Sequence, residues 1–172
     1  PAPSSGHGGT VGMSGFAKAV VKITKDFDGK GIAALKERIK AAGGVSVRVG
    51  LPDGKAEKDG TPLTTLGFVH EFGAPQKGIP ERSFMRSTMH EQGKKYAETM
   101  GTGLRDIANG KTTAAEVLGK VGVVATGDVQ AKIASGDFAA LDPKTIKRKG
   151  SSKPLIDTGQ LRQSVAWEIS ND

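Results

Sequence analysis

The residues that most suggest chemistry in this sequence are Gly110-Lys111-Thr112, because Gly-Lys-Thr ends the phosphate-binding loop of many nucleotide-binding proteins. That loop has another glycine five positions before its second glycine, and this chain has Arg105 at that position. A glycine-rich turn from a strand into a helix, whose backbone amides would hold a phosphate, is also missing. We therefore interpret the segment as a turn between two helices.

The remaining reactive residue types form no recognisable catalytic or metal-binding pattern. His70-Glu71 lacks the second histidine of a zinc-protease helix, and His7 and His90 are isolated in the sequence. The chain has no cysteine, which excludes disulfides and thiolate metal ligands. It also has no Gly-x-Ser-x-Gly nucleophile motif. We predict that the protein is not an enzyme and has no catalytic, cofactor-binding or metal-binding residues.

The charge balance is basic. Lysine and arginine total 25 and aspartate and glutamate total 18, which gives a net charge of +7. This is compatible with a nucleic-acid partner, although the positive charges are spread along most of the chain. The densest basic run, expected to be a loop, contains Lys144, Lys147, Arg148, Lys149 and Lys153. It either contacts DNA phosphates or an acidic partner, or is a solvated loop, and we favour the solvated loop.

Length and composition indicate one folded domain with a small core. The 172 residues suit a single domain, and a hydrophobic fraction of 36% with 25 glycines leaves little apolar material for a large core. Contacts with neighbouring subunits are expected to add stability. No apolar run approaches the roughly 20 residues of a membrane helix, so no membrane partner is expected. We predict a flexible arm at 1–15, rich in Gly, Ser and Pro, followed by one domain over 16–172.

Helical periodicity is clearest in the second half of the chain. Apolar stripes predict two longer helices over 83–108 and 113–134, the second starting with the capping-box pattern Thr113-x-x-Glu116. A short turn would join them as an antiparallel hairpin. Shorter helices are expected over 31–42, where Gly43-Gly44 follows as a terminator, and from Pro62 to Glu71.

Three segments are predicted strands: 45–51 and 164–169 alternate apolar and polar residues as half-buried strands do, and 17–26 mixes β-branched residues with lysine. The predicted fold class is therefore α+β, with a small, mainly antiparallel sheet and the two longer helices packed on one face. The segments 53–61 and 135–153 are expected to be irregular loops. Long loops often carry binding, so we expect these two to dock partners.

Two segments together resemble a known family. One is TLGFVHEFG at 65–73, followed by IPERSFMR at 79–86, and the other is KPLIDTGQLRQSV at 153–165. Both are similar to the tailed-phage virion-morphogenesis family of minor tail, neck and tail-completion proteins, with "EFG…IPxRxFhR" and "PLhDTGxLRxSh" stretches, where h is apolar. The order and separation of the segments also agree, and the resemblance covers about residues 45–169. Glu81 departs from the family, which often has a small residue there.

Residues of these two segments suggest structural and contact roles. The expected scaffold residues are Glu71, Phe72, Gly73, Pro80, Asp157, Thr158, Gly159 and Leu161. Asp157 or Thr158 would cap a short helical turn, with Gly159 in its opening. The candidate contacts with other subunits or partners are Arg82, Phe84, Arg86 and Arg162, because guanidinium groups bind carboxylates bidentately.

The resemblance implies a structural virion protein that forms a homo-oligomeric ring, expected to be hexameric, at the head–tail connection or the end of the tail tube. Its partners would be other phage neck, connector or tail-tube proteins, and genomic DNA would pass through the lumen without sequence-specific contact. The ring would be assembled in the host cytoplasm and reside in the virion. Two alternatives are a non-specific DNA-binding module in phage morphogenesis and a small hydrolase.

Overall fold

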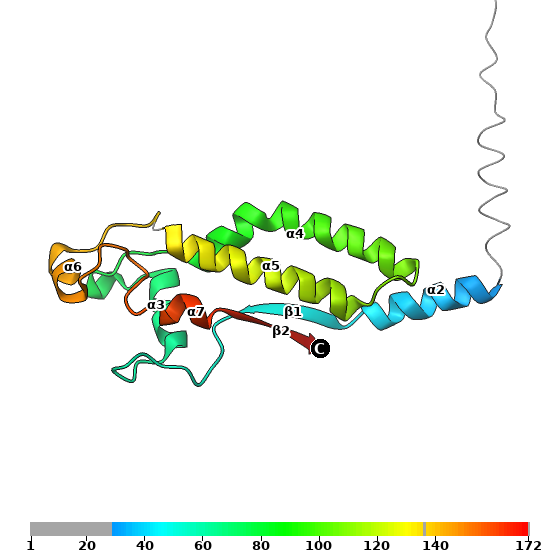
Figure 1. The fold of residues 1–172 in the computed structure, drawn as a ribbon, viewed down its shortest axis with the longest axis horizontal. Helices are drawn as coiled ribbons and strands as arrows, with labels where there is room; N and C mark the ends of the chain where they lie inside the picture. Colours follow the sequence, from blue (N-terminus) through cyan, green and yellow to red (C-terminus); the bar gives the residue numbers. More distant parts are fainter. Residues whose placement is uncertain (1–28, 136, 172) are drawn as a thin grey trace, which may run out of the picture.

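The protein has an α+β fold, in which a two-stranded antiparallel sheet is covered on one side by a long helical hairpin (Figure 1). The computed structural model describes residues 29–135 and 137–171. In chain order the elements are α2 (Gly29–Ala42), β1 (Val45–Gly50), α3 (Leu63–Phe72), the 3-10 turn η1 (Pro75–Lys77), α4 (Phe84–Ala108), α5 (Ala114–Ser135), α6 (Pro143–Lys149), α7 (Gln160–Ser164) and β2 (Ala166–Asn171). The expected arm at 1–15 and the expected strand at 17–26 lie outside the described residues.

The hairpin of α4 and α5 confirms the two predicted longer helices. The capping box at the start of α5 is formed: the Thr113 hydroxyl accepts a hydrogen bond from the amide of Glu116, and the Glu116 carboxylate accepts one from the amide of Thr113, both at 3.3 Å. The helices approach closely where Gly103 faces Val117, since a Cβ on Gly103 would lie 2.2 Å from a Val117 methyl group. Helix α5 packs on the sheet and α4 packs on α5.

The sheet pairs two strands from opposite ends of the described chain. Val47 lies opposite Ile169 and Val49 lies opposite Trp167. Alternate side chains of a strand point to opposite faces, so these residues share one face of the sheet. Trp167 packs on α5, where a Cβ on Gly122 would lie 2.7 Å from the indole ring. The glycine therefore allows the strand to reach the helix.

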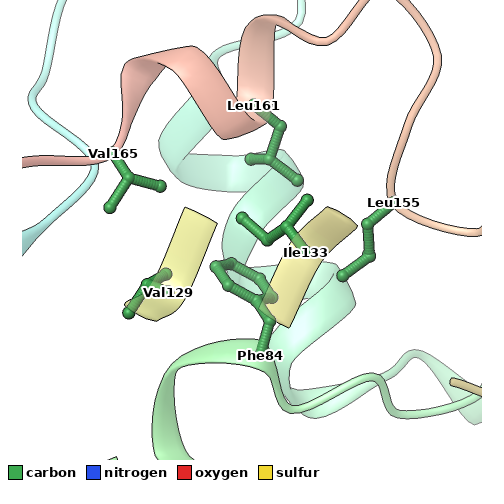
Figure 2. Close-up of a cluster of buried hydrophobic side chains, with 6 residues drawn as sticks. All are labelled: Phe84, Val129, Ile133, Leu155, Leu161 and Val165. Atoms are coloured by element: carbon green, nitrogen blue, oxygen red, sulfur yellow. The ribbon is translucent and has the colours of Figure 1, made fainter. Parts of the chain in front are cut away.

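The core lies where the helical hairpin meets the last third of the chain (Figure 2). Phe84 at the start of α4 packs with two residues of α5 and three residues from the segment around α7; the complete cluster is Phe84, Val129, Ile133, Leu155, Leu161 and Val165. All six side chains are buried. This cluster fixes α7 and β2 against the hairpin.

One predicted loop contains a helix. Residues 143–149 form α6, although we expected 135–153 to be irregular. The Asp142 carboxylate accepts a hydrogen bond from the Lys144 amide at 2.8 Å, Pro143 occupies the first turn, and Gly150 ends the helix in the left-handed conformation. These end signals outweigh the repulsion among the lysines.

Helix α2 confirms the helix predicted over 31–42, but its apolar stripe is not buried. Ile32 is 50% exposed and Ile39 is 60% exposed. The guanidinium of Arg38 donates a hydrogen bond to the Ala108 carbonyl oxygen at 3.1 Å, which attaches α2 to the end of α4. Among the described residues, no helix combines the length and apolarity needed to span a membrane.

Candidate functional site

The first family-like segment is organised around the carboxylate of Glu71. This residue lies in the last turn of α3 and is only 6% exposed. Its Oε2 accepts a hydrogen bond from the Met85 amide at 2.9 Å, and its Oε1 accepts one from the Arg86 amide at 2.9 Å. The hydroxyl of Ser83 also donates to Oε1, at 2.8 Å. Glu71 thus caps the free amides at the start of α4, which no side chain of α4 itself satisfies.

The electrostatics of Glu71 follow from this arrangement. Burial alone raises the pKa of the carboxyl group, because it disfavours the charged form. The hydrogen bonds from Met85, Arg86 and Ser83 together outweigh burial and hold the pKa of Glu71 below its usual value. The ionised carboxylate is therefore a fixed structural element at neutral pH.

Arg86 connects Glu71 to the surface. Its guanidinium lies 3.1 Å from Glu71 Oε1 and 2.7 Å from Glu81 Oε1. It also stacks 4.6 Å from the centre of the Phe72 ring, which in turn lies 4.8 Å from Phe68. Glu81, the departure from the family pattern, therefore adds a carboxylate partner for Arg86.

Arg82 and Phe84, two of the expected contact residues, are buried within the chain. Arg82 is 3% exposed, and its guanidinium donates to the carbonyl oxygens of Ala139 at 3.0 Å and Ala140 at 3.3 Å. Phe84 is completely buried in the core. Neither side chain is available to a partner in this conformation, because Arg82 holds the 139–140 segment and Phe84 fills the space between the hairpin and α7.

The turn between α3 and α4 depends on Gly73. Its φ of +74° is in the left-handed region, and a Cβ there would lie 2.8 Å from the backbone nitrogen of Glu81. Ile79 pairs in extended conformation with Ala74, as expected for a residue before proline, here Pro80. The Arg82 amide then donates to the carbonyl oxygen of His70 at 2.7 Å, which closes the turn.

The second family-like segment is anchored by buried Leu155 and Leu161. Of Asp157 and Thr158, it is Thr158 that binds the first residue of α7. Its hydroxyl accepts a hydrogen bond from the Gln160 amide at 3.2 Å and donates one to the Glu57 carboxylate at 3.0 Å. Gly159 directly precedes α7 with a φ of +81°. Asp157 is exposed.

Both family-like segments line one cleft of about 1120 Å³, together with residues from 57–61 and 140–149. His70, Arg82, Lys149 and Leu161 are among its lining residues. The Nδ1 atom of His70 is buried, and no group of the described residues forms a hydrogen bond with it. Burial, followed by the positive charges of Arg82 and Lys149, lowers the pKa of His70 to about 4. His70 is therefore neutral at physiological pH.

The residues of the basic run differ in their surroundings: three are exposed and one is bound to the backbone. Lys144, Lys147 and Arg148 are exposed on α6, where their spacing of three and four residues places them on one side of the helix. Lys149 instead donates to the carbonyl oxygens of Lys153 and Pro154, both at 3.2 Å.

Two further charged residues that we expected to contact partners remain at the surface. Lys153 reaches the Ala134 carbonyl oxygen at 3.4 Å. Arg162 is exposed on α7. Of the four expected contact residues, Arg86 and Arg162 thus remain accessible.

Sequence reasoning missed three residues of this site. Ser83 donates to Glu71, Glu57 accepts from Thr158, and Phe68 extends the aromatic surface of Phe72. A serine directly before a helix is a recognisable signal for Ser83. The contact of Glu57 with Thr158 joins residues 101 positions apart and has no local signal.

Within residues 29–135 and 137–171, no cluster of three or more His, Asp or Glu side chains could hold a metal ion. Searches against protein-family models, curated proteins and solved structures find no match to this chain.

Proposed function

We propose that the protein is a non-enzymatic structural subunit of a tailed bacteriophage, which forms a ring at the head–tail connection or at the end of the tail tube. The observation that carries this proposal is the meeting of the two family-like segments. Phe84 of the first packs in one buried cluster with Leu155, Leu161 and Val165 of the second. Residues about 70 positions apart that resemble one family therefore act as one structural unit.

The roles of the polar residues support a structural function. The side chains of Glu71 and Arg86 bind each other and the backbone, and Arg82 binds the backbone of the 139–140 segment. These contacts join α3, α4 and the 139–140 segment. A reaction centre would instead require polar groups directed at a substrate in the cleft. We infer that these side chains stabilise the conformation of this part of the chain.

In the proposed assembly, copies of the chain form a homo-oligomeric ring, expected to be hexameric, which stacks on other neck, connector or tail-tube proteins. DNA passes through its lumen without sequence-specific contacts. The ring is assembled in the host cytoplasm and resides in the virion.

Electron microscopy tests the proposal directly. We expect the purified full chain to form rings, and gold-labelled antibodies against it to mark the head–tail junction or the tail end of intact particles. A mature virion without this polypeptide would refute the proposed function. Turnover of a substrate that depends on one side chain would also refute it.

A second candidate function, non-specific DNA binding, is favoured by one observation. Lys144, Lys147 and Arg148 share one side of α6 and are exposed, which suits contact with successive phosphates. Salt-dependent binding of duplex DNA by the isolated chain is the discriminating measurement.

A further inference from the structure

The cleft lined by both family-like segments contains a buried positive charge without a carboxylate partner. Arg82 lines this cleft and is 3% exposed, and the two hydrogen bonds of its guanidinium go to backbone carbonyl oxygens. None of the ion pairs within residues 29–135 and 137–171 includes Arg82. A buried charge is costly unless an opposite charge accompanies it. An anion supplied from outside the chain would remove this cost.

Arg82 and His70 also have unused hydrogen-bonding atoms at the cleft. Within the described ranges, Nη1 of Arg82 and Nε2 of His70 form no hydrogen bond. Neither atom is enclosed, whereas the unpartnered Nδ1 of His70 is. Because Arg82 is held in place and does not extend to a partner, a partner's group must itself enter the cleft to reach these atoms.

Lys149 places a second positive charge beside these two side chains. Its pKa is lowered by burial and by the charges of Arg82 and Arg148, which together outweigh the opposite effect of Asp157. The charges of Arg82 and Lys149 also act on His70. The three side chains therefore lie close together, and a small anion placed between them would interact with all three.

The carboxylates around the cleft do not supply this anion. Five line it, and four of these accept a hydrogen bond or form an ion pair with another residue of the chain at 2.7–3.0 Å, namely Glu57, Asp59, Glu81 and Asp142. The fifth, Asp157, is exposed and acts on Lys149. Lys58 and Arg148 are exposed and add two positive charges to the lining. Among these mixed charges, the buried one left without a partner is that of Arg82.

The shape of the cleft favours a protein segment as the ligand. Its volume of about 1120 Å³ exceeds the roughly 300–1,000 Å³ of pockets for small molecules. Apolar side chains form much of its wall: Leu66, Val69, Phe72, Ile79, Leu141 and Leu161. It lies toward the end of the molecule opposite α2, where α3, α6 and α7 come together (Figure 1). The segments 53–61 and 135–153, which we expected to dock partners, both contribute to its lining.

A carboxylate fits this site better than a phosphate does. A phosphate group carries about two negative charges, which the five surrounding carboxylates would repel. A carboxylate carries one negative charge and forms charge-assisted hydrogen bonds with guanidinium and ammonium groups.

We propose that the cleft binds an aspartate or glutamate side chain of a partner protein, flanked by apolar residues, with its carboxylate between Arg82, Lys149 and His70. The apolar neighbours of that carboxylate lie on the leucine side chains and Phe72 of the wall. The inference rests on the proposed function, which requires partners that dock, and it names the chemistry of the docking segment.

Three short peptides of one design test the site. The probe acetyl-Gly-Leu-Glu-Leu-Gly-amide carries the proposed carboxylate, and its Gln and Lys counterparts are the controls. Titration of the full chain, followed through its backbone amide signals by two-dimensional NMR, gives the Kd of each peptide and locates the residues that respond. We expect the Glu peptide to bind at least about tenfold more tightly than the Gln peptide and to shift amides that line the cleft.

Substitutions in the cleft identify the groups that bind. Arg82→Met and Lys149→Met should each weaken binding of the Glu peptide by about tenfold and leave binding of the Gln peptide unchanged. Lys147→Met, on the same helix as Lys149 but outside the cleft, is the matched control and should bind both peptides as the natural chain does. Circular dichroism establishes that each variant is folded. If Arg82→Met unfolds, Lys149→Met and the comparison of the three peptides still decide the outcome.

The remaining outcomes separate this site from the proposed function. Equal or undetectable binding of the Glu and Gln peptides, or amide shifts centred on the exposed lysines of α6, would overturn the site. Tighter binding of inorganic phosphate than of the Glu peptide would overturn the choice of a carboxylate. Rings in electron micrographs of a chain that shows no preference for the Glu peptide would overturn the site and leave the proposed function intact. A preference for the Glu peptide in a chain that forms no rings would support the site and count against the proposed function.

Discussion

The carboxylate of Glu71 on α3 lies 2.9 Å from the amide nitrogen of Met85 in the first turn of α4. Helix α4 is thus capped by a side chain from another helix, 14 residues earlier in the chain. The usual N-cap contributes about 1 kcal/mol from a local side chain. Here the cap also joins α3 to α4, so the stability of α4 and the position of Phe72 beside Arg86 depend on the same carboxylate.

Substitution of Glu71 by alanine is expected to lower the free energy of unfolding by about 3 kcal/mol, because it removes the cap and the buried partner of the Arg86 and Ser83 donors. Urea denaturation at pH 7 measures the loss. Glu98→Ala, an exposed carboxylate in the middle of α4, is the matched control and should stay within about 0.5 kcal/mol of the natural chain. Equal effects of the two variants would contradict the capping role.

The Glu71 carboxylate also makes the free energy of unfolding depend on pH. The pKa of Glu71 is lowered in the folded chain from an ordinary value of 4.5, so its contribution to stability is complete above pH 4.5 and is lost as the pH falls through the lower folded pKa. The stability difference between the natural chain and Glu71→Gln should therefore narrow below pH 4.5. A difference that does not change with pH would argue against an ionised Glu71.

His70 gives a separate pH dependence. Its pKa is lowered from 6.5 to about 4 in the folded chain, so between these values the unfolded chain binds more protons. The contribution of His70 to the free energy of unfolding is therefore fully present above pH 6.5, and about 2–3 kcal/mol of it is lost as the pH falls toward 4. His70→Gln should flatten the stability profile in this window, whereas His90→Gln, at an exposed position, should keep the natural slope. Identical slopes in the two variants would contradict a buried neutral His70.

The long helices could be predicted from sequence because their signals are local. The stripes and the Thr113-x-x-Glu116 box place α4 and α5 within one residue of their observed ends. The two strands also follow from alternation, since each has one face on a helix and one toward solvent. The predicted start of the second strand at 164 was wrong by two residues, because Ser164 ends α7 and β2 begins at Ala166.

The site could be predicted only in part, because its contacts are distant in sequence. The family-like motifs pointed to Glu71, Gly73 and Thr158, but Arg82 finds its carbonyl partners 57 and 58 residues later. No pattern near Arg82 distinguishes a buried guanidinium from an exposed one. Helix α6 is a different case, because its end signals, Asp142-Pro143 and Gly150, are local and stand on either side of a run of lysines that is typical of a loop.

Two glycines of α5 are expected to respond oppositely to alanine. At Gly122 a Cβ would lie 2.7 Å from the Trp167 ring, so Gly122→Ala should destabilise the chain by about 1–3 kcal/mol as the strand is pushed away. At Gly127 a Cβ meets nothing within 4 Å, and Gly127→Ala should stabilise by up to about 1 kcal/mol through helix propensity. Trp167 is the single tryptophan, so its fluorescence reports both unfolding and displacement of β2. Destabilisation by both variants would show that α5 tolerates no side chain at either position.

Removal of the exposed cations of α6 separates the two candidate functions. If Lys144, Lys147 and Arg148 each contact a phosphate, the triple alanine variant should reduce the slope of log affinity for duplex DNA against log salt by about 2.7. The proposed structural role predicts a smaller change in this slope. Lys149, held by two carbonyl oxygens, provides the control: Lys149→Met should lower stability and leave the salt slope unchanged. Nanomolar binding by a monomer, lost in the triple variant, would favour the DNA-binding function over the ring.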